Sequence, residues 1–156
     1  MMDIIAIFVA KYLFLASLLI SGIYFLKQKH LRKRILALSA ISLPLAAFGA
    51  FILHHIYFNP RPFVVGKFVP LVSHVADNGF ASDHALFTSL IAAILYTCNR
   101  RIGIFLFIVS FLISISRVYL GLHHAVDVIA GTFLGIAVVA LVQALIKRFI
   151  SERILK

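Results

Sequence analysis

Residues 125–146 read AVDVIAGTFLGIAVVALVQALI and contain a single charged residue, Asp127. A helix needs about 20 predominantly apolar residues in a row to cross a lipid bilayer. Four other stretches have the same character: residues 4–26, 35–57, about 80–98, and 102–120. They do not alternate apolar and polar residues as barrel strands do, and helices are the remaining way to satisfy the backbone in lipid. The sequence therefore predicts an all-α integral-membrane helical bundle of about five transmembrane helices, with a sixth possible.

The composition also indicates a membrane protein. Of the 156 residues, 63% are hydrophobic and 13% are charged, whereas soluble domains carry about 25% charged residues. This excludes a soluble globular fold, and we expect residues 1–156 to form one transmembrane domain. Cys98 is the only cysteine, which excludes an intrachain disulfide and a cysteine-based metal site.

The basic residues indicate the orientation in the membrane, because short cytoplasmic loops collect lysine and arginine. Most of them fall in the first connection, the third connection and the tail: Lys27, Lys29, Arg32, Lys33, Arg34, Arg100, Arg101, Lys147, Arg148, Arg153 and Lys156. We expect these places on the cytoplasmic side of the plasma membrane, with the N-terminus outside and the C-terminus cytoplasmic. The formal charge of +10 then reports orientation, and no nucleic-acid partner is expected.

The long connection at residues 58–79 falls on the predicted outer side. Its apolar piece, residues 63–72, is too short to span a bilayer. We interpret this piece as an interfacial or re-entrant loop.

Most of the other ionisable residues gather at the predicted outer ends of the helices. They are three of the five acids and six of the seven histidines: Asp77, Asp83, Asp127, His54, His55, His74, His84, His123 and His124. Ionisable groups in or near a membrane are costly and usually face a polar cavity, so this cluster indicates a functional site. The alternative is a hydrated rim at the level of the lipid headgroups, without chemistry.

The pattern Ser116-Arg117, five residues, His123, three residues, Asp127 places the last two residues at positions i and i+4. On a helix they lie one above the other, and the carboxylate can accept a hydrogen bond from Nδ1–H of the imidazole. Nε2 is then left unprotonated, which makes a histidine nucleophilic. His124 is the weaker candidate, and a helix-terminal pair of this kind also arises for structural reasons alone.

The segment Ala81-Ser82-Asp83-His84 is predicted to open the third helix, with Ser82 as its N-cap. The free N–H groups of a helix N-terminus form an anion site, although a plain capping serine explains the same residues. Arg61 and Arg117 supply donors that suit a phosphate. These groups fit phosphoryl transfer, in which one histidine attacks phosphorus and another protonates the departing oxygen.

Arg61-Pro62, then Ser82-Asp83-His84, then Ser116-Arg117 with His123 and Asp127, resemble the three signature motifs of the type 2 phosphatidic acid phosphatase superfamily. These motifs are K-x6-R-P, P-S-G-H and S-R-x5-H-x3-D. The resemblance implies that His123 is a nucleophile that forms a phosphohistidine, that Asp127 orients it, and that His84 is the acid and then the base. It also implies a phosphate cradle of Arg61, Ser82 and Arg117, without a metal ion or other cofactor.

Three positions depart from these motifs. His54 stands in place of the lysine, so one phosphate contact is either a titrating imidazole or lost, and Ala81 replaces a proline. Asp83 replaces a glycine, and Ser-Asp-His is similar to the form in the bacterial undecaprenyl-diphosphate phosphatases of the bacitracin-resistance type. We include His54 and Asp83 among the predicted phosphate-binding residues. The family usually has six spans, and this chain lacks one before the first motif.

The resemblance implies a membrane lipid phosphatase whose site faces outward, with a lipid phosphate or diphosphate as its partner and undecaprenyl diphosphate as the favoured substrate. Phosphatidic acid or phosphatidylglycerophosphate is the alternative substrate. A hypothesis of another class makes the histidines and acids a proton or metal relay of a transport protein. An inactive structural relative is the third hypothesis.

Overall fold

The computed structural model describes residues 1–149 and is helical throughout its apolar segments. The elements are α1 (Met2–Phe8), η1 (Val9–Leu13), α2 (Phe14–Lys27), η2 (Lys29–Leu31), α3 (Arg32–Ile56), α4 (Pro62–Val65), α5 (Asp83–Cys98), α6 (Arg100–Tyr119) and α7 (Ala125–Phe149). Within residues 1–149 the only β-type pairing is an isolated bridge between Pro60 and Asn78. The predicted all-α fold is confirmed.

In the part of the chain that the structure describes, four segments are long and apolar enough to cross a membrane: Met2–Lys27, Lys29–Ile56, Arg100–Tyr119 and Ala125–Phe149. They correspond to four of the five predicted spans. The fifth, α5, is a shorter apolar helix of 16 residues, which makes it about 24 Å long at 1.5 Å per residue. It begins at Asp83, directly after Ser82, whose backbone is extended.

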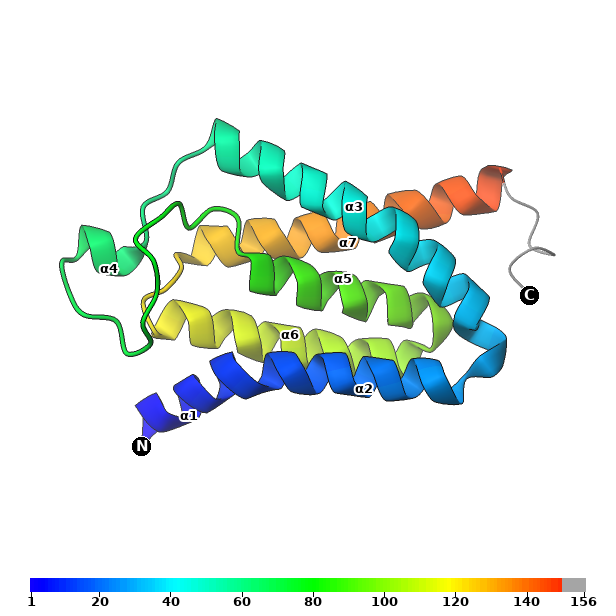
Figure 1. Cartoon of the computed structure of the whole chain (residues 1–156), viewed down its shortest axis with the longest axis horizontal. Helices are drawn as coiled ribbons and strands as arrows, with labels where there is room; N and C mark the ends of the chain where they lie inside the picture. Colours follow the sequence, from blue (N-terminus) through cyan, green and yellow to red (C-terminus); the bar gives the residue numbers. More distant parts are fainter. Residues whose placement is uncertain (150–156) are drawn as a thin grey trace.

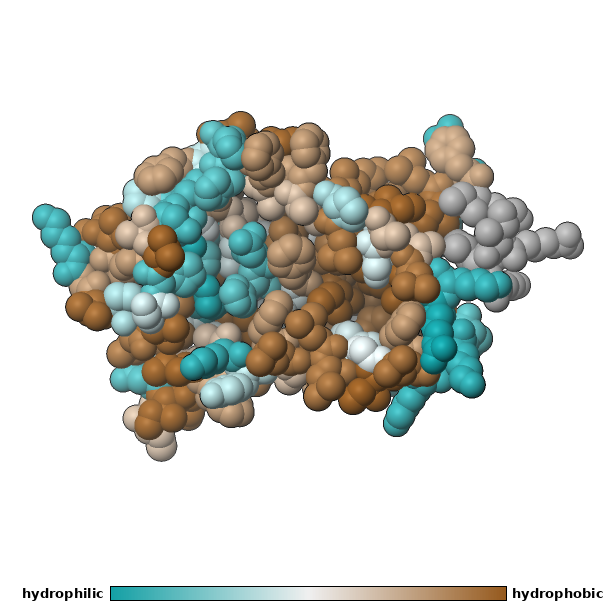
Figure 2. All heavy atoms as spheres, in the orientation of Figure 1, coloured by the Kyte–Doolittle hydropathy of each residue, from teal (hydrophilic) through white to brown (hydrophobic). Residues whose placement is uncertain are grey.

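The short helix α5 lies at the centre of the bundle, between α6 on one side and α3 and α7 on the other (Figure 1). Its buried side chains, such as Leu86, Leu90 and Leu95, belong to one core cluster with Leu38 of α3, Leu106 of α6 and residues of α7. The outward faces are apolar as well, since large hydrophobic side chains cover most of the surface (Figure 2). An apolar exterior around an apolar core is what a helix bundle in lipid requires.

Two glycines let α7 approach α5 closely. A Cβ atom at Gly131 would lie 2.5 Å from the carbonyl oxygen of Ser82, and one at Gly135 would lie 2.6 Å from that of Leu86. Small residues at such contacts allow helix backbones to pack against each other in membranes. The Gly131 and Gly135 pair therefore serves packing within the chain and fixes the start of α5 beside α7.

The connections between the helices lie at two opposite ends of the bundle. The α2–α3 connection, the α5–α6 connection and the end of α7 are at one end, while α4 and the long loop are at the other (Figure 1). The predicted basic clusters therefore share one end, except for Arg153 and Lys156, which lie outside the described residues.

In the predicted interfacial piece, only Pro62–Val65 forms a short helix, and the side chain of Val69 is 91% exposed.

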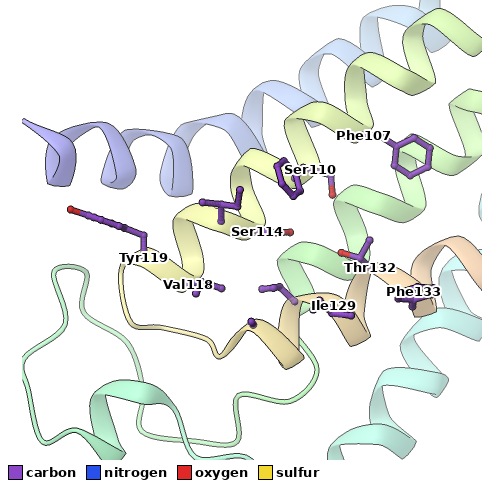
Figure 3. Close-up of a pocket in the computed structure, with 12 residues that line it drawn as sticks. Phe107, Ser110, Ser114, Val118, Tyr119, Ile129, Thr132 and Phe133 are labelled. Carbon is purple, nitrogen blue, oxygen red and sulfur yellow. The ribbon is translucent and has the colours of Figure 1, made fainter.

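A cavity of about 650 Å³ lies between α6 and α7. Phe107 and Ser114 of α6 and Ile129 and Phe133 of α7 line its two sides (Figure 3). No histidine, acid or basic residue lines it. Its polar side chains carry only hydroxyl groups, from serine, threonine and tyrosine, and no base that could activate them lines the cavity, so the candidate site lies elsewhere.

Candidate active site

A tight turn after α6 places His123 beside Arg117. Gly121 has a φ of 70°, a left-handed conformation that glycine adopts without steric cost. The reversal is closed by hydrogen bonds from the N–H groups of Leu122 and His123 to the carbonyl of Arg117, at 3.1 and 3.3 Å. His123 is thereby returned toward the bundle and is 3% exposed.

The long loop at residues 57–82 is fastened at its base by Asn78. The Asn78 side chain accepts hydrogen bonds from the N–H groups of Asn59 and Phe80 and donates to the carbonyls of His54 and Tyr57. This buried amide joins the end of α3 to the segment before α5. Sequence reasoning missed Asn78, and the only local signal is an asparagine before a glycine, which indicates a turn.

A cavity of about 530 Å³ opens at this end of the molecule. Six of the predicted site residues line it: His54, Arg61, Asp83, His84, Arg117 and His123. His74, Asp77 and Asn78 of the loop line it too, although they were not among the predicted site residues. Figure 2 shows hydrophilic side chains gathered over the same end and, as a separate group, at the opposite end, with a mostly apolar surface between them. The structure thus brings together side chains from α3, α5, α6 and two connections.

His123 is held by contacts at both ring nitrogens. Nδ1 lies 3.0 Å from the carbonyl oxygen of Gly79 and 3.5 Å from Oδ2 of Asp127, while Nε2 lies 3.2 Å from Nη1 of Arg61. A guanidinium can only donate, so Nε2 accepts, and the proton of a neutral ring is on Nδ1. This is the tautomer expected of a nucleophile. The nearest acceptor of the Nδ1 proton, however, is the backbone carbonyl of Gly79 and not the carboxylate of Asp127.

The prediction that His123 and Asp127 share one helix face was wrong. α7 begins at Ala125, so His123 precedes the helix. Asp127 is fully buried and its Oδ2 accepts from the N–H of His124 at 2.8 Å, as an acid in the first turn of a helix does when it reaches back to the N-cap. Its Oδ1 accepts from Nδ2 of Asn59 at 2.7 Å. These two hydrogen bonds hold the carboxylate at the start of α7. Its contact with Nδ1 of His123 is longer, at 3.5 Å.

The two predicted arginines are both buried and face the cavity. Arg61 pairs through Nε with the carboxylate of Asp77, and its Nη1 also donates to the carbonyl of Leu122 at 2.9 Å. Burial acts to raise the pKa of Asp77, but the Arg61 guanidinium lowers it below its usual value. Nη2 of Arg117 lies 3.3 Å from Nε2 of His74, while its buried Nε has no hydrogen-bond partner. An anion in the cavity could satisfy that donor.

Ser82 stands at the N-cap position of α5, as predicted, but its hydroxyl makes no capping hydrogen bond. The hydroxyl is fully buried and has no partner, and the Ser82 N–H donates to the carbonyl of Asp127 at 3.0 Å. Neither Ser82 nor Asp127 lines the cavity. Both lie behind its wall, where the close packing of α5 on α7 holds them.

The remaining histidines differ in their surroundings. His84, in the first turn of α5, lines the cavity, and its ring is tilted against that of Phe14 with 5.0 Å between the ring centroids. His54 lines it from the last turn of α3, with Nδ1 3.2 Å from the carbonyl oxygen of Phe80. His55 and His124 instead contact backbone carbonyls, those of Phe51 and Pro60, outside the cavity lining.

Metal ligands do not converge in the part of the chain that the structure describes. Within residues 1–149, no three His, Cys, Asp or Glu side chains lie close enough together to hold a metal ion. The cavity instead presents two arginines among its histidines. Such a set favours an anionic ligand over a cation.

Known proteins resemble this chain in sequence. A family model described as the PAP2 superfamily matches residues 35–151. Undecaprenyl-diphosphatase BcrC of Bacillus subtilis (strain 168) is 32% identical over 138 residues, an alignment that covers 88% of this chain and 71% of that protein.

Two solved structures resemble the fold. LpxE of Aquifex aeolicus superimposes with a TM-score of 0.75 at 22% identity, covering 90% of this chain and 86% of that chain. A transmembrane PAP2 type phosphatidylglycerolphosphate phosphatase from Bacillus subtilis superimposes with a TM-score of 0.59 at 21% identity, covering 94% and 85%.

Proposed function

This chain belongs to the PAP2 superfamily of lipid phosphatases, and from that premise we propose that it hydrolyses undecaprenyl diphosphate to undecaprenyl phosphate. The observation that carries the proposal is the 3.2 Å contact between Nη1 of Arg61 and Nε2 of His123. It places a donor for a phosphoryl oxygen next to the unprotonated nitrogen of a buried histidine. Those are the two groups that a phosphoryl transfer to histidine requires.

In the proposed first step, the diphosphate enters the cavity and its oxygens take the donors of Arg61 and Arg117. Nε2 of His123 attacks phosphorus, and the bond from phosphorus to the bridging oxygen breaks. His84 gives a proton to the departing oxygen of the lipid monophosphate. The carbonyl of Gly79 and the carboxylate of Asp127, both close to Nδ1, stabilise the positive charge that the ring acquires.

In the second step, water attacks the phosphohistidine and His84 takes up its proton. Inorganic phosphate leaves, and His123 and His84 return to their initial protonation states. The net reaction consumes one water for each diphosphate bond. Asp83 and His54, which line the same cavity, contact the bound phosphates in this proposal, and Ser82 supports the start of α5.

The proposed substrate rests on chemistry and on the relatives. Several apolar helices make this a multi-pass membrane protein, so a lipid phosphate reaches the cavity from the bilayer. The bacterial relative at 32% identity is named an undecaprenyl-diphosphatase. We place the cavity on the outer side of the plasma membrane, because the basic connections lie at the opposite end.

A substrate panel tests the proposed function. Purified protein is offered undecaprenyl diphosphate, undecaprenyl phosphate, phosphatidic acid and phosphatidylglycerophosphate in excess chelator, and released phosphate is measured. We expect release from the diphosphate by the wild type, background release by His123→Ala, and near wild-type release by the matched control His55→Ala. Full activity of His123→Ala would refute the mechanism. Release from none of the lipids would refute the phosphatase and favour the relay or transport hypothesis.

A further inference from the structure

The cavity holds two pairs of an arginine and a histidine. In the first pair, Nη1 of Arg61 lies 3.2 Å from Nε2 of His123. In the second, Nη2 of Arg117 lies 3.3 Å from Nε2 of His74. The rings of the two histidines lie 6.5 Å apart between centroids, nearly perpendicular. The proposed reaction uses three of these four residues and leaves His74 without a role.

The position of His74 indicates contact with a ligand. It lies on the long loop, three residues before Asp77, and its side chain is half-buried against the cavity. Its Nε2 accepts from Arg117, since a guanidinium can only donate. A phosphoryl oxygen is a stronger acceptor than a neutral imidazole, so an anion at Arg117 would displace His74 from that bond and lie against its ring.

The buried Nε of Arg117 supports the same conclusion. This atom has no hydrogen-bond partner, although Arg117 is only 6% exposed. Leaving a buried charged donor unsatisfied is costly. Arg61, in contrast, already contacts Asp77, Leu122 and His123. The hydrogen-bond donor that is available to a ligand is therefore Nε of Arg117, the arginine that contacts His74.

A highly charged anion in this cavity would need cationic donors beyond the two arginines. The two arginines are balanced by the carboxylates of Asp77 and Asp83, so the fixed charges cancel. A diphosphate carries more negative charge than a monophosphate, and additional cationic donors must come from the histidines. Burial, with Arg61 and Arg117, lowers the pKa of His74, and Asp77 opposes that effect. An anion beside the ring would raise the pKa of His74, because a negative charge favours the protonated ring.

We propose that His74 is a further substrate-contacting residue, which binds with Arg117 the phosphoryl group next to the lipid while Arg61 and His123 receive the terminal one. The second pair makes the site selective for a diphosphate over a monophosphate. The inference rests on the proposed function, because it assigns two positions in the same cavity to the two phosphoryl groups of the substrate.

Binding of two non-hydrolysable ligands tests the inference without requiring turnover. Methylenediphosphonate and methylphosphonate are titrated calorimetrically into the wild type, His74→Gln, His74→Ala and the control His55→Ala. Glutamine keeps an oxygen that can accept from Arg117 but cannot become a cation. We expect His74→Gln to weaken diphosphonate binding about tenfold and methylphosphonate binding less than about twofold, the size of one charge-assisted hydrogen bond. His55→Ala should bind both ligands as the wild type does.

The outcomes separate this inference from the proposed function. If glutamine restores binding of both ligands to wild-type levels, His74 only holds Arg117 in place and the inference is wrong. Equal weakening of both ligands, or a wild type that binds them equally well, also overturns it. Failure of the proposed function instead appears as an absence of phosphate release by the wild type, whatever the calorimetry gives.

Discussion

Nη1 of Arg61 lies 3.2 Å from Nε2 of His123, although 62 residues separate the two along the chain. Because the guanidinium donates, the contact directs the lone pair of Nε2 toward the position where Arg61 would hold a phosphoryl oxygen. The carbonyl of Gly79 fixes the other side of the ring. The proposed nucleophile and the arginine that would bind the phosphoryl group are thus preorganised by the turn after α6 and the loop after α3.

Asp127→Asn tests the role of the buried carboxylate. Both oxygens of Asp127 accept from N–H donors, of Asn59 and His124, so an amide group must turn its NH₂ toward one of them. We expect kcat to fall by about 10²- to 10⁴-fold, because the imidazole loses the charge that stabilises its cationic form. The measurement is kcat on undecaprenyl diphosphate, with folding checked by thermal unfolding. A variant that folds like the wild type and keeps more than about half of its kcat would contradict the assignment.

The acidic limb of the pH profile reports the protonation of His123. Burial lowers the pKa of His123, Asp127 opposes this, and Arg61 and Arg117 lower it further. Because the neutral ring is the proposed nucleophile, activity should persist as the pH falls through 6.5, the ordinary value for histidine, and should be lost only below it. Replacing Arg117 with glutamine removes one lowering charge, so the limb should move to higher pH. The measurement is kcat/KM against pH, and a limb that stays in place in this variant would argue against the assignment.

Gly131→Ala tests the packing that positions α5. A methyl group there would meet the Ser82 carbonyl at 2.5 Å, so we expect a loss of about 1–3 kcal/mol in the free energy of unfolding, as for other overpacked sites. Gly22→Ala is the matched control, because nothing lies within 4 Å of that position; it should be neutral or stabilising by up to about 1 kcal/mol. Thermal unfolding in detergent compares the two, and equal stabilities would refute the close approach.

The orientation in the membrane is tested by thiol labelling in a Cys98→Ala background. Val69→Cys places a thiol on the loop next to the cavity, where the side chain is 91% exposed. His30→Cys places one in the exposed basic connection at the opposite end. A membrane-impermeant reagent should label only Val69→Cys in cells with an intact plasma membrane. The reverse pattern would show that the cavity faces the cytoplasm.

The helices could be predicted from the sequence because a run of apolar residues has few other solutions in lipid. The exception is α5, because a helix of 16 residues is too short to be identified as a membrane span by its length alone. Its place at the centre of the bundle depends on contacts with α6 and α7, which no local pattern reveals. The four-residue spacing of Gly131 and Gly135 is typical of close helix packing in membranes, but it does not tell which helix they meet.

The candidate site was predicted wherever a motif fixes residue type and spacing, as for Arg61, Arg117 and His123. Contacts made by the long loop were missed, because they join residues far apart in sequence. Gly79 contributes a backbone carbonyl, which carries no side-chain signal, and Asn59 reaches Asp127 across 68 positions. His123 and Asp127 do approach each other, at 3.5 Å, but they do not share a helix face, because His123 precedes α7.

The most direct test of a two-step transfer through His123 is the stereochemical course at the transferred phosphorus. A lipid diphosphate analogue with a terminal thiophosphate made chiral by oxygen isotopes is hydrolysed in labelled water, and the configuration of the released thiophosphate is determined. Each in-line displacement inverts phosphorus, so the account predicts overall retention from two displacements. Overall inversion would mean that water attacks the substrate directly, and it would contradict the phosphohistidine.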